Sequence, residues 1–506
     1  MTTTPVSATV ITVNNHKEQP DMHFNSIHKA AILVATLLTQ SVLPHLATAQ
    51  DIGDIPPEVR IITNGHNFPA DAYTLLVQEV GNPTPVLAIN IDQPMNPAST
   101  IKTLTTLAGL EVLGSDYTWK TEVYALGPVS DGTLQGDLLI RGGADPFLVE
   151  EHVRSMLKIL RRRGVQHITG DLILDNSLFD TTMLAGSPVD NQSGRAYNVA
   201  PEALLFNFQV VNFFFYPHTN GRDVIVRSDP ALPNLRIDNR LQQRDGACTG
   251  YQRGISFSEN SENNTVTFSG EHPSRCGEYS MTRAVLDPAQ YNYGLFQALW
   301  RELGGEFDGQ LRQGSLDSLA TADATPFVVW QSPPLDDIIK SINKFSNNMM
   351  TRQLLLTLGL QHAGVPASID KGIEAVQQYL DGVGIDRSAL VMTNGSGLSR
   401  DTTLTADMLG AVLQRGYQIP TMPEFVASLP LAGIDGTMRN RMTSGDGHAS
   451  SHIKTGSLND VAGIAGYVHA RSGKHYVVVA LVNHAQAHAG PGQELGDALL
   501  GWVWRH

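Results

Sequence analysis

The sequence is poor in cysteine, in charged residues and, above all, in positive charge. Only two of its 506 residues are cysteine, Cys248 and Cys276, and no pair of histidines stands beside them, which argues against a zinc site. The formal net charge of −14 argues against a nucleic-acid partner, because a phosphate backbone requires a basic face. No nucleotide-binding glycine pattern and no internal repeat is evident. The chain is instead a globular protein with room for about three domains.

Beyond the first fifty residues, no apolar run reaches the length of about 20 residues that a membrane span needs. Residues 22–49 have the order of an export signal: a basic start, a short apolar run over 30–38, and Ala-Thr-Ala at 47–49. A membrane anchor is the weaker interpretation, because polar residues and a proline interrupt the run. We therefore expect residues 1–49 to be a cleaved signal region, with Met22 as an alternative start.

Export would carry both cysteines into an oxidising compartment. We expect Cys248 and Cys276 to pair with one another there. Closing a loop of this length stabilises a fold by roughly 3–4 kcal/mol through the lost entropy of the unfolded chain.

The predicted elements place strands near both ends of the chain and helices between them. Many short β segments fill residues 203–287, and a Pro-rich boundary stands at 331–334. This order predicts one sheet that is assembled from the two ends of the chain, with the β-rich section inserted between them. The predicted strands outside the insertion are 72–79, 85–92, 451–457, 462–470 and 475–483, and the predicted helices are 335–342, 349–358, 369–380, 405–414 and 494–504.

The first candidate for chemistry is a serine and a lysine at the start of an apolar helix. Ser99 and Lys102 lie three residues apart, on one face of a helix predicted to begin around Ser99 and to continue through 104–113. Burial near a helix N-terminus lowers the pKa of an amine and lets it take the proton of a hydroxyl. The spacing alone decides nothing, because four other pairs share it: Ser26/Lys29, Ser155/Lys158, Ser341/Lys344 and Ser451/Lys454.

Two further motifs follow Ser99 in the chain. Ser346 and Asn348 belong to a Ser-x-Asn motif in a predicted loop between helices. Lys454 opens the only Lys-Thr-Gly of the sequence, on a predicted strand where Gly456 would let a ligand backbone come close. All three motifs in this order and in these contexts indicate an active-site serine enzyme.

These motifs resemble those of the penicillin-binding serine DD-peptidases. The long gap between Lys102 and Ser346 is similar to the gap in the class C low-molecular-weight group. The members of this group are the D-alanyl-D-alanine carboxypeptidase/endopeptidases of peptidase family S13. Segments 332–335, 394–400 and 429–437 also resemble family segments, and the resemblance covers about residues 70–506.

The resemblance implies an α/β (α+β) fold. A β-lactamase/transpeptidase-like catalytic domain would comprise residues 51–117 and 331–506. The mainly β insertion at 118–330 would form two lobes, one nested in the other at about 145–220.

The resemblance also implies a role for each motif. Ser99 would attack the carbonyl of the penultimate D-alanine, and Lys102 would be the general base. Ser346 would relay a proton to the leaving amine, and Asn348 would hold the substrate amide and the lysine amine.

The strand motif would bind the substrate. Lys454 and Thr455 would hold its terminal carboxylate, with Gly456 beside them. The backbone N–H groups of Ser99 and Ser457 would form the oxyanion hole.

A further pocket would take the side chain of the diamino acid of a peptidoglycan stem peptide. The resemblance assigns Asp175, Phe179 and Arg400 to it, a carboxylate for the ammonium and a guanidinium for the carboxylate. Asn459 stands where a relative has glutamine, which changes the shape expected for this pocket.

The implied partners are stem peptides ending in D-Ala-D-Ala or joined by D,D cross-links, with β-lactams as covalent inhibitors and no cofactor or metal. His484 and His488 have the spacing of a metal pair, but Gly490 and Pro491 break the helix that would present them. The implied location is the periplasm. The resemblance leaves open whether the protein associates loosely with the membrane and whether it forms a homodimer. The alternatives are a serine β-lactamase and a catalytically idle peptidoglycan-binding protein.

Overall fold

A computed structural model describes residues 51–180, 190, 192, 194–248, 254–319 and 324–506. All of them belong to one compact unit, Ala49–His506, and the expected signal region lies outside the described residues. No helix in these ranges is long and apolar enough to cross a membrane.

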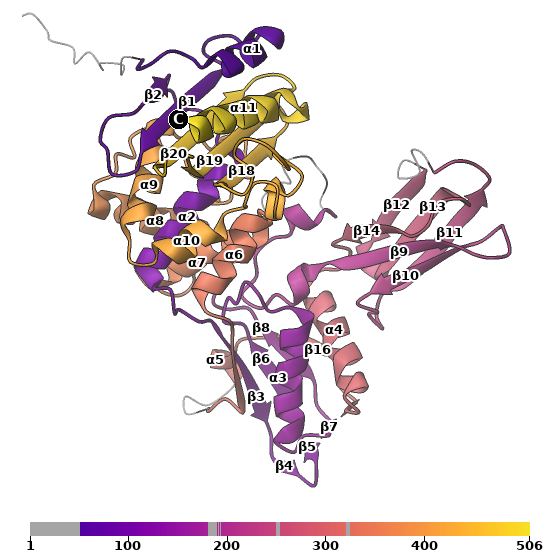
Figure 1. Cartoon of the computed structure of the whole chain (residues 1–506). Coiled ribbons are helices and arrows are strands. Elements are labelled where there is room, and N and C mark those ends of the chain that lie inside the picture. Colours follow the sequence, from indigo (N-terminus) through magenta and orange to yellow (C-terminus); the bar gives the residue numbers. More distant parts are fainter. Residues whose placement is uncertain (1–50, 181–189, 191, 193, 249–253, 320–323) are drawn as a thin grey trace, which may run out of the picture. The chain divides into compact units, whose positions relative to one another are not determined.

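A five-stranded antiparallel sheet forms the centre of the catalytic domain (Figure 1). Its order is β18-β19-β20-β1-β2, so strands from both ends of the chain meet where Leu75 of β1 pairs with Ala480 of β20. The sheet thus contains strands from both ends of the chain, as the order of the predicted elements indicated. Its strands are β1 (Tyr73–Glu79), β2 (Leu87–Ile89), β18 (Ser451–Leu458), β19 (Val461–His469) and β20 (His475–Asn483).

Helices cover both faces of this sheet, which is why β20 is apolar along almost its whole length. Side chains alternate between the faces: Leu75 packs with the terminal helix, and Leu76 packs with the helical middle of the chain. On the first face lie α1 (Pro57–Gly65) and α11 (Pro491–Arg505). On the second lie α2 (Lys102–Leu113), α6 (Leu335–Lys344), α7 (Asn348–Ala363), α8 (Ile369–Val383), α9 (Ala406–Gln418) and α10 (Met422–Ser428).

Helix α2 is buried along nearly all of its length. Leu104 and Leu107 belong to the core that α7 and α9 complete. The threonines between them bond to backbone carbonyl groups: Thr106 donates to Lys102, and Thr105 donates to Gly395. A helix of this composition can therefore run through the interior without leaving its polar groups unpaired.

The insertion begins with a lobe built around a five-stranded sheet of order β16-β8-β6-β3-β17. Strands from both ends of the insertion meet in this sheet. The chain of the insertion therefore leaves this lobe and later returns to it. Its strands are β3 (Lys120–Leu126), β6 (Asp137–Arg141), β8 (Leu172–Asp175), β16 (Leu311–Gln313) and β17 (Val328–Gln331), and its two long helices are α3 (Glu150–Arg162) and α4 (Pro288–Glu302).

A second lobe is nested within the first, but not at the expected residues 145–220. Strand β8 pairs in parallel with β6, so the chain up to Asp175 belongs to the first lobe. The nested lobe consists of two three-stranded sheets, β10-β9-β14 and β11-β13-β12. Its strands are β9 (Val211–Pro217), β10 (Val224–Asp229), β11 (Arg236–Arg244), β12 (Ile255–Asn260), β13 (Thr265–Pro273) and β14 (Tyr279–Arg283).

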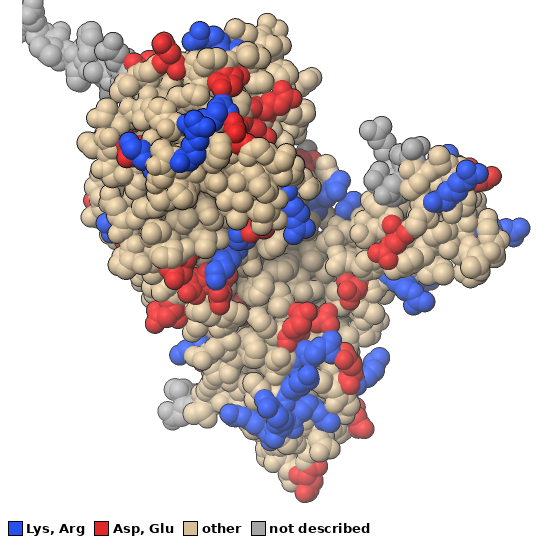
Figure 2. Space-filling view, in the orientation of Figure 1, with Lys and Arg blue, Asp and Glu red and all other residues tan. Residues whose placement is uncertain are grey.

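Basic side chains gather over α3 on the face of the molecule drawn in Figure 2. Several of them already have partners: Arg154 pairs with Glu150 and Glu302, and Arg161 lies over the ring of Trp300. Much of this basic cluster therefore stabilises the first lobe itself.

Cys248 and Cys276 form a disulfide in the nested lobe. The cysteines are 28 residues apart, and the loop between them carries β12 and β13. The cross-link restricts the unfolded form of this lobe.

We expect replacement of both cysteines by serine to lower the free energy of unfolding of the nested lobe by about 3–4 kcal/mol, because the unfolded chain regains the entropy of a loop of this size. Urea unfolding of the oxidised protein and of the double variant measures the difference. Equal midpoints for the two proteins would contradict this account of the disulfide.

Candidate active site

Ser99 lies in a short 3-10 turn, η1 (Ala98–Ile101), which continues directly into α2. The helix therefore begins within one residue of the predicted start, although its first turn is tighter than an α-helix. Asn96 fixes this turn: its side chain accepts the N–H of Ala98, and its backbone exchanges two hydrogen bonds with the side chain of Asn483 at the end of β20. The central sheet thus sets the position of Ser99.

Two glycines allow neighbouring segments to approach η1. A Cβ on Gly456 would stand 2.6 Å from the carbonyl oxygen of Pro97 and 3.0 Å from the backbone nitrogen of Ser99. A Cβ on Gly397, whose φ is +76°, would stand 1.8 Å from the carbonyl oxygen of Ala98. Gly456 was expected to let a ligand approach, whereas here it lets η1 lie against β18.

The amine of Lys102 touches three oxygen atoms. Its Nζ lies 2.9 Å from Oγ of Ser99, 2.7 Å from Oδ1 of Asn348 and 2.5 Å from the carbonyl oxygen of Ser396. Lys102 is fully buried, and this burial, with the charge of Lys454 nearby, holds its pKa well below the usual value for lysine.

A neutral amine fits these three contacts. It has two N–H bonds and one lone pair. The oxygens of Asn348 and Ser396 can only accept, so they take both N–H bonds. The lone pair then faces the hydroxyl of Ser99 and can receive its proton.

A second amine and hydroxyl pair lies close by. Ser346, with a φ of +54°, forms the turn between α6 and α7, and its Oγ lies 3.0 Å from Nζ of Lys454. Burial lowers the pKa of Lys454 to about 7. The side chain of Asn347 caps α7 by accepting the N–H of Met350, which places Asn348 in the first turn of that helix.

The two pairs face one cavity of about 360 Å³. Ser99, Ser346 and Asn348 line it, with Ser457 from the end of β18. Thr455 lies beside them on the same strand and bonds to the hydroxyl of Thr437. The cavity is also lined by Asp190, Tyr197, Leu398, Arg400, Leu458, Asn459 and His488.

The structure brings together most of the residues predicted for the site. Those at or beside the cavity are Ser99, Lys102, Ser346, Asn348, Arg400, Lys454, Thr455, Gly456, Ser457 and Asn459. Arg400 and Asn459 contact each other, because the guanidinium donates to the backbone carbonyl of Asn459 at 2.6 Å.

Asp175 and Phe179 do not lie in this cavity, so their predicted place in the site is wrong. They line a different cavity in the insertion. Asp175 ends β8 with a fully buried carboxylate that accepts the backbone N–H groups of Ser177 and Leu316. Its oxygens therefore stabilise the first lobe and are not directed toward Ser99.

Three polar residues that line the cavity were missed by the sequence interpretation, namely Asp190, Tyr197 and His488. Asp190 accepts hydrogen bonds from the hydroxyl of Tyr197 and from the amide of Asn198. Burial raises the pKa of Asp190, but these hydrogen bonds outweigh it and hold the pKa below its usual value. His488, interpreted as a loop histidine, accepts the backbone N–H of Asp460 through Nδ1.

No periodic pattern marks Asp190 or Tyr197, so only their residue types indicate a function for them. The part of the chain that the structure describes holds no group of three side chains suited to a metal ion.

Comparison with known proteins decides the family. The sequence profile of the D-Ala-D-Ala carboxypeptidase 3 (S13) family matches residues 59–502. The chain belongs to this family. It is therefore a serine peptidase, as predicted, and the comparisons do not favour a β-lactamase or an idle binding protein.

Two curated relatives have the same kind of name. The D-alanyl-D-alanine carboxypeptidase of Actinomadura sp. strain R39 is 30% identical over 407 residues, which cover 78% of this chain and 74% of the relative. The D-alanyl-D-alanine carboxypeptidase DacB of Haemophilus influenzae is 26% identical over 402 residues, 77% of this chain and 80% of the relative.

Solved structures of other proteins share the fold of this chain. Penicillin binding protein 4 (dacB) from Haemophilus influenzae superposes with a TM-score of 0.74 at 22% identity, covering 88% of this chain and 99% of that protein. A penicillin G acylated predatory endopeptidase from Bdellovibrio bacteriovorus superposes with a TM-score of 0.50 at 16% identity, covering 85% of this chain and 91% of that one. The expected transpeptidase-like fold with a large insertion is confirmed.

The two lowered lysine pKa values predict opposing effects of pH on acylation by a β-lactam. The rate should rise as Lys102 loses its proton, well below pH 10.5, and fall near pH 7 as Lys454 loses the charge that attracts the ligand carboxylate. Stopped-flow acylation across pH 5–10 would measure both limbs.

A β-lactam whose carboxylate is converted to a neutral amide serves as the control. Its profile should lose the alkaline limb and keep the acid limb. An acid limb near the ordinary lysine pKa, or an alkaline limb that the neutral ligand retains, would contradict these assignments.

Proposed function

We propose that this protein is a serine D-alanyl-D-alanine carboxypeptidase/endopeptidase that acts on peptidoglycan stem peptides through an acyl-enzyme on Ser99. The contact of Lys102 with Ser99, inside a cavity that Ser346 and Asn348 share, carries the proposal. The family membership supplies the reaction class, and the geometry supplies a nucleophile with its base.

In the first step, Oγ of Ser99 bonds to the carbonyl carbon of the penultimate D-alanine while Lys102 takes the hydroxyl proton. The C–N bond then breaks, and the proton that Lys102 took reaches the leaving amine by way of Ser346, which ends the step as a hydroxyl while Lys102 is again neutral. Water hydrolyses the ester and returns Ser99 to its hydroxyl form. The oxyanion is held by the backbone N–H groups of Ser99 and Ser457, each donor contributing on the order of 10²–10³ in rate. The close approach of η1 to Gly456 supports this pairing of donors.

Lys454 and Thr455 bind the terminal carboxylate of the substrate. Lys454 is protonated below about pH 7, and the hydroxyl of Thr455 is oriented by Thr437. A charge-assisted contact of this kind favours substrates with a free C-terminus, and a β-lactam presents its carboxylate in the same way.

The diamino acid of the stem peptide lies between Asp190 and Arg400. Asp190 takes the role that the sequence suggested for Asp175, because its ionised carboxylate lines the same cavity as Ser99. Tyr197 takes the place expected of Phe179 and orients the carboxylate through its hydroxyl. A side chain with an ammonium and a carboxylate complements these two charges.

The location is the periplasm, reached by export and cleavage of residues 1–49, with loose association to the membrane. The absence of an apolar spanning helix among the described residues is compatible with this location.

The reaction is tested by D-alanine release from a peptide ending in D-Ala-D-Ala. The mature protein should release one D-alanine per peptide, and the Ser99→Ala variant should release none above background. Release that survives Ser99→Ala would contradict the proposal, as would an intact protein that opens β-lactams rapidly and leaves the peptide untouched.

Asp190→Asn should lower kcat/KM by about 10–100-fold for a peptide with a free diamino acid amine, since a hydrogen bond to a charged group contributes roughly 1.5–3 kcal/mol. The same peptide with its amine acetylated should lose little. The control is Asp175→Asn, which should lower thermal stability without changing the preference for the free amine. A selectivity change in Asp175→Asn alone would reverse the two assignments.

A further inference from the structure

A second cavity, of about 580 Å³, lies beside the residues that line the Ser99 cavity. We call it the arginine cavity after two of its lining residues, Arg195 and Arg283. Arg195 belongs to the segment 194–198, and Arg283 ends strand β14 of the nested lobe. The cavity therefore joins the active-site segment to the nested lobe.

Residues close together in the sequence line both cavities. Asp190 and Tyr197 line the Ser99 cavity, whereas Gln192 and Arg195 line the arginine cavity. The segment is docked on the nested lobe, because the N–H of Ala284 donates to the carbonyl of Gly194 at 3.0 Å. A long ligand in the Ser99 cavity could thus extend into the second cavity.

Neither arginine of this cavity has a carboxylate within ion-pair distance in the described ranges. Arg195 donates to the side chain of Gln192, and Arg283 donates to the carbonyl of Thr282 and lies 5.5 Å above the ring of Phe257. Burial and then the charge of Arg195 lower the pKa of Arg283. Two guanidinium groups thus repel each other across a partly buried space, which an anion would relieve.

The remaining walls favour an organic anion over a small inorganic one. Phe257, Tyr279 and Met281 supply an apolar surface next to the guanidinium groups. Glu259 is the one acidic residue among the described lining residues, and burial raises its pKa. A ligand with both a carboxylate and an apolar or sugar body would match this combination.

We propose that the arginine cavity binds a carboxylate of the peptidoglycan strand, away from the bond that Ser99 cleaves, and so selects long or cross-linked substrates over short peptides. This rests on the proposed function for the identity of the strand. The binding contacts are Arg195 and Arg283 for the carboxylate, with Phe257 and Tyr279 against the body of the ligand.

The test uses binding without turnover. In the mature Ser99→Ala protein, calorimetry compares a disaccharide-pentapeptide with the same fragment amidated at every carboxylate except the C-terminal one and that of the diamino acid side chain, which Arg400 binds in the Ser99 cavity. The free form should bind about 10-fold more tightly, in the range of charge-assisted hydrogen bonds to arginine. Arg195→Gln with Arg283→Gln should abolish that preference and leave the amidated form unchanged.

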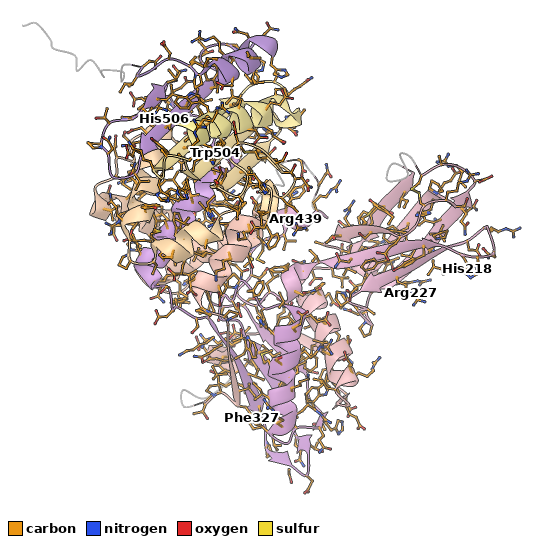
Figure 3. All side chains as sticks on the ribbon, in the orientation of Figure 1. His218, Arg227, Phe327, Arg439, Trp504 and His506 are labelled. Atoms are coloured by element: carbon orange, nitrogen blue, oxygen red, sulfur yellow. A yellow bond between two sulfur atoms is a disulfide. The ribbon has the colours of Figure 1, made fainter. Side chains whose placement is uncertain are left out.

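Two further variants are expected to tighten the binding of the free form or to leave it unchanged. Glu259→Gln removes the competing negative charge and should tighten binding of the free form a few-fold. Arg227→Gln is the matched control, because Arg227 is an exposed arginine on β10, the strand at the opposite edge of the sheet from β14, as labelled in Figure 3. It should change nothing.

Equal losses for both fragments in the double variant, or no loss at all, would overturn the proposal. So would competition by inorganic phosphate at the affinity of the free fragment. The outcome is separate from that of the proposed function: normal D-alanine release from a short peptide with no carboxylate preference in the long fragment rejects the arginine cavity alone. Absence of D-alanine release rejects the reaction while the binding comparison still reports on the cavity.

Discussion

The structure depends on one constraint, the burial of the Lys102 amine without a carboxylate partner among the described residues. Burial and then the charge of Lys454 lower the pKa of this amine well below the usual value for lysine. In the mechanism that we propose, the neutral amine is the base, and the two acceptor oxygens of Asn348 and Ser396 direct its lone pair at Ser99. The fold thus lowers the pKa of an amine that is charged in water.

Several elements contribute to this burial. Helix α2 is surrounded by α6, α7 and α9, and its threonines satisfy polar groups in the interior. The turn that carries Ser99 is held by Asn96 and Asn483 and by the glycines of two neighbouring segments. The insertion contributes Asp190 and Tyr197 to the cavity, so residues from both parts of the chain line it.

Strong local patterns made much of the fold predictable. The continuous apolar run of β20 and the helical spacing after Ser99 placed the central sheet and α2 correctly. Helix α1 was not predicted, because few of its side chains are buried. The nested lobe was misplaced because the pairing of β6 with β8 joins strands across a helix and leaves no mark in the local sequence.

The residues of the site also divide into those that local sequence patterns predicted and those that they did not. The motifs brought Ser99, Ser346 and both lysines to one cavity, because the chemistry that we propose fixes their spacing. Asp190 belongs to no such motif and reaches the cavity only through tertiary folding, whereas Asp175 was assigned by the family resemblance and lines a different cavity. Gly456 was located correctly, but its contact is with η1, which only the packing of the turn reveals.

The central claim is that Ser99 is the nucleophile and forms an acyl-enzyme. Mass spectrometry of the mature protein after reaction with a penicillin tests it directly. We predict one ester adduct, on the peptide that contains Ser99, and none in the Ser99→Ala variant. An adduct on another serine, Ser346 included, or labelling that persists in Ser99→Ala would contradict the claim.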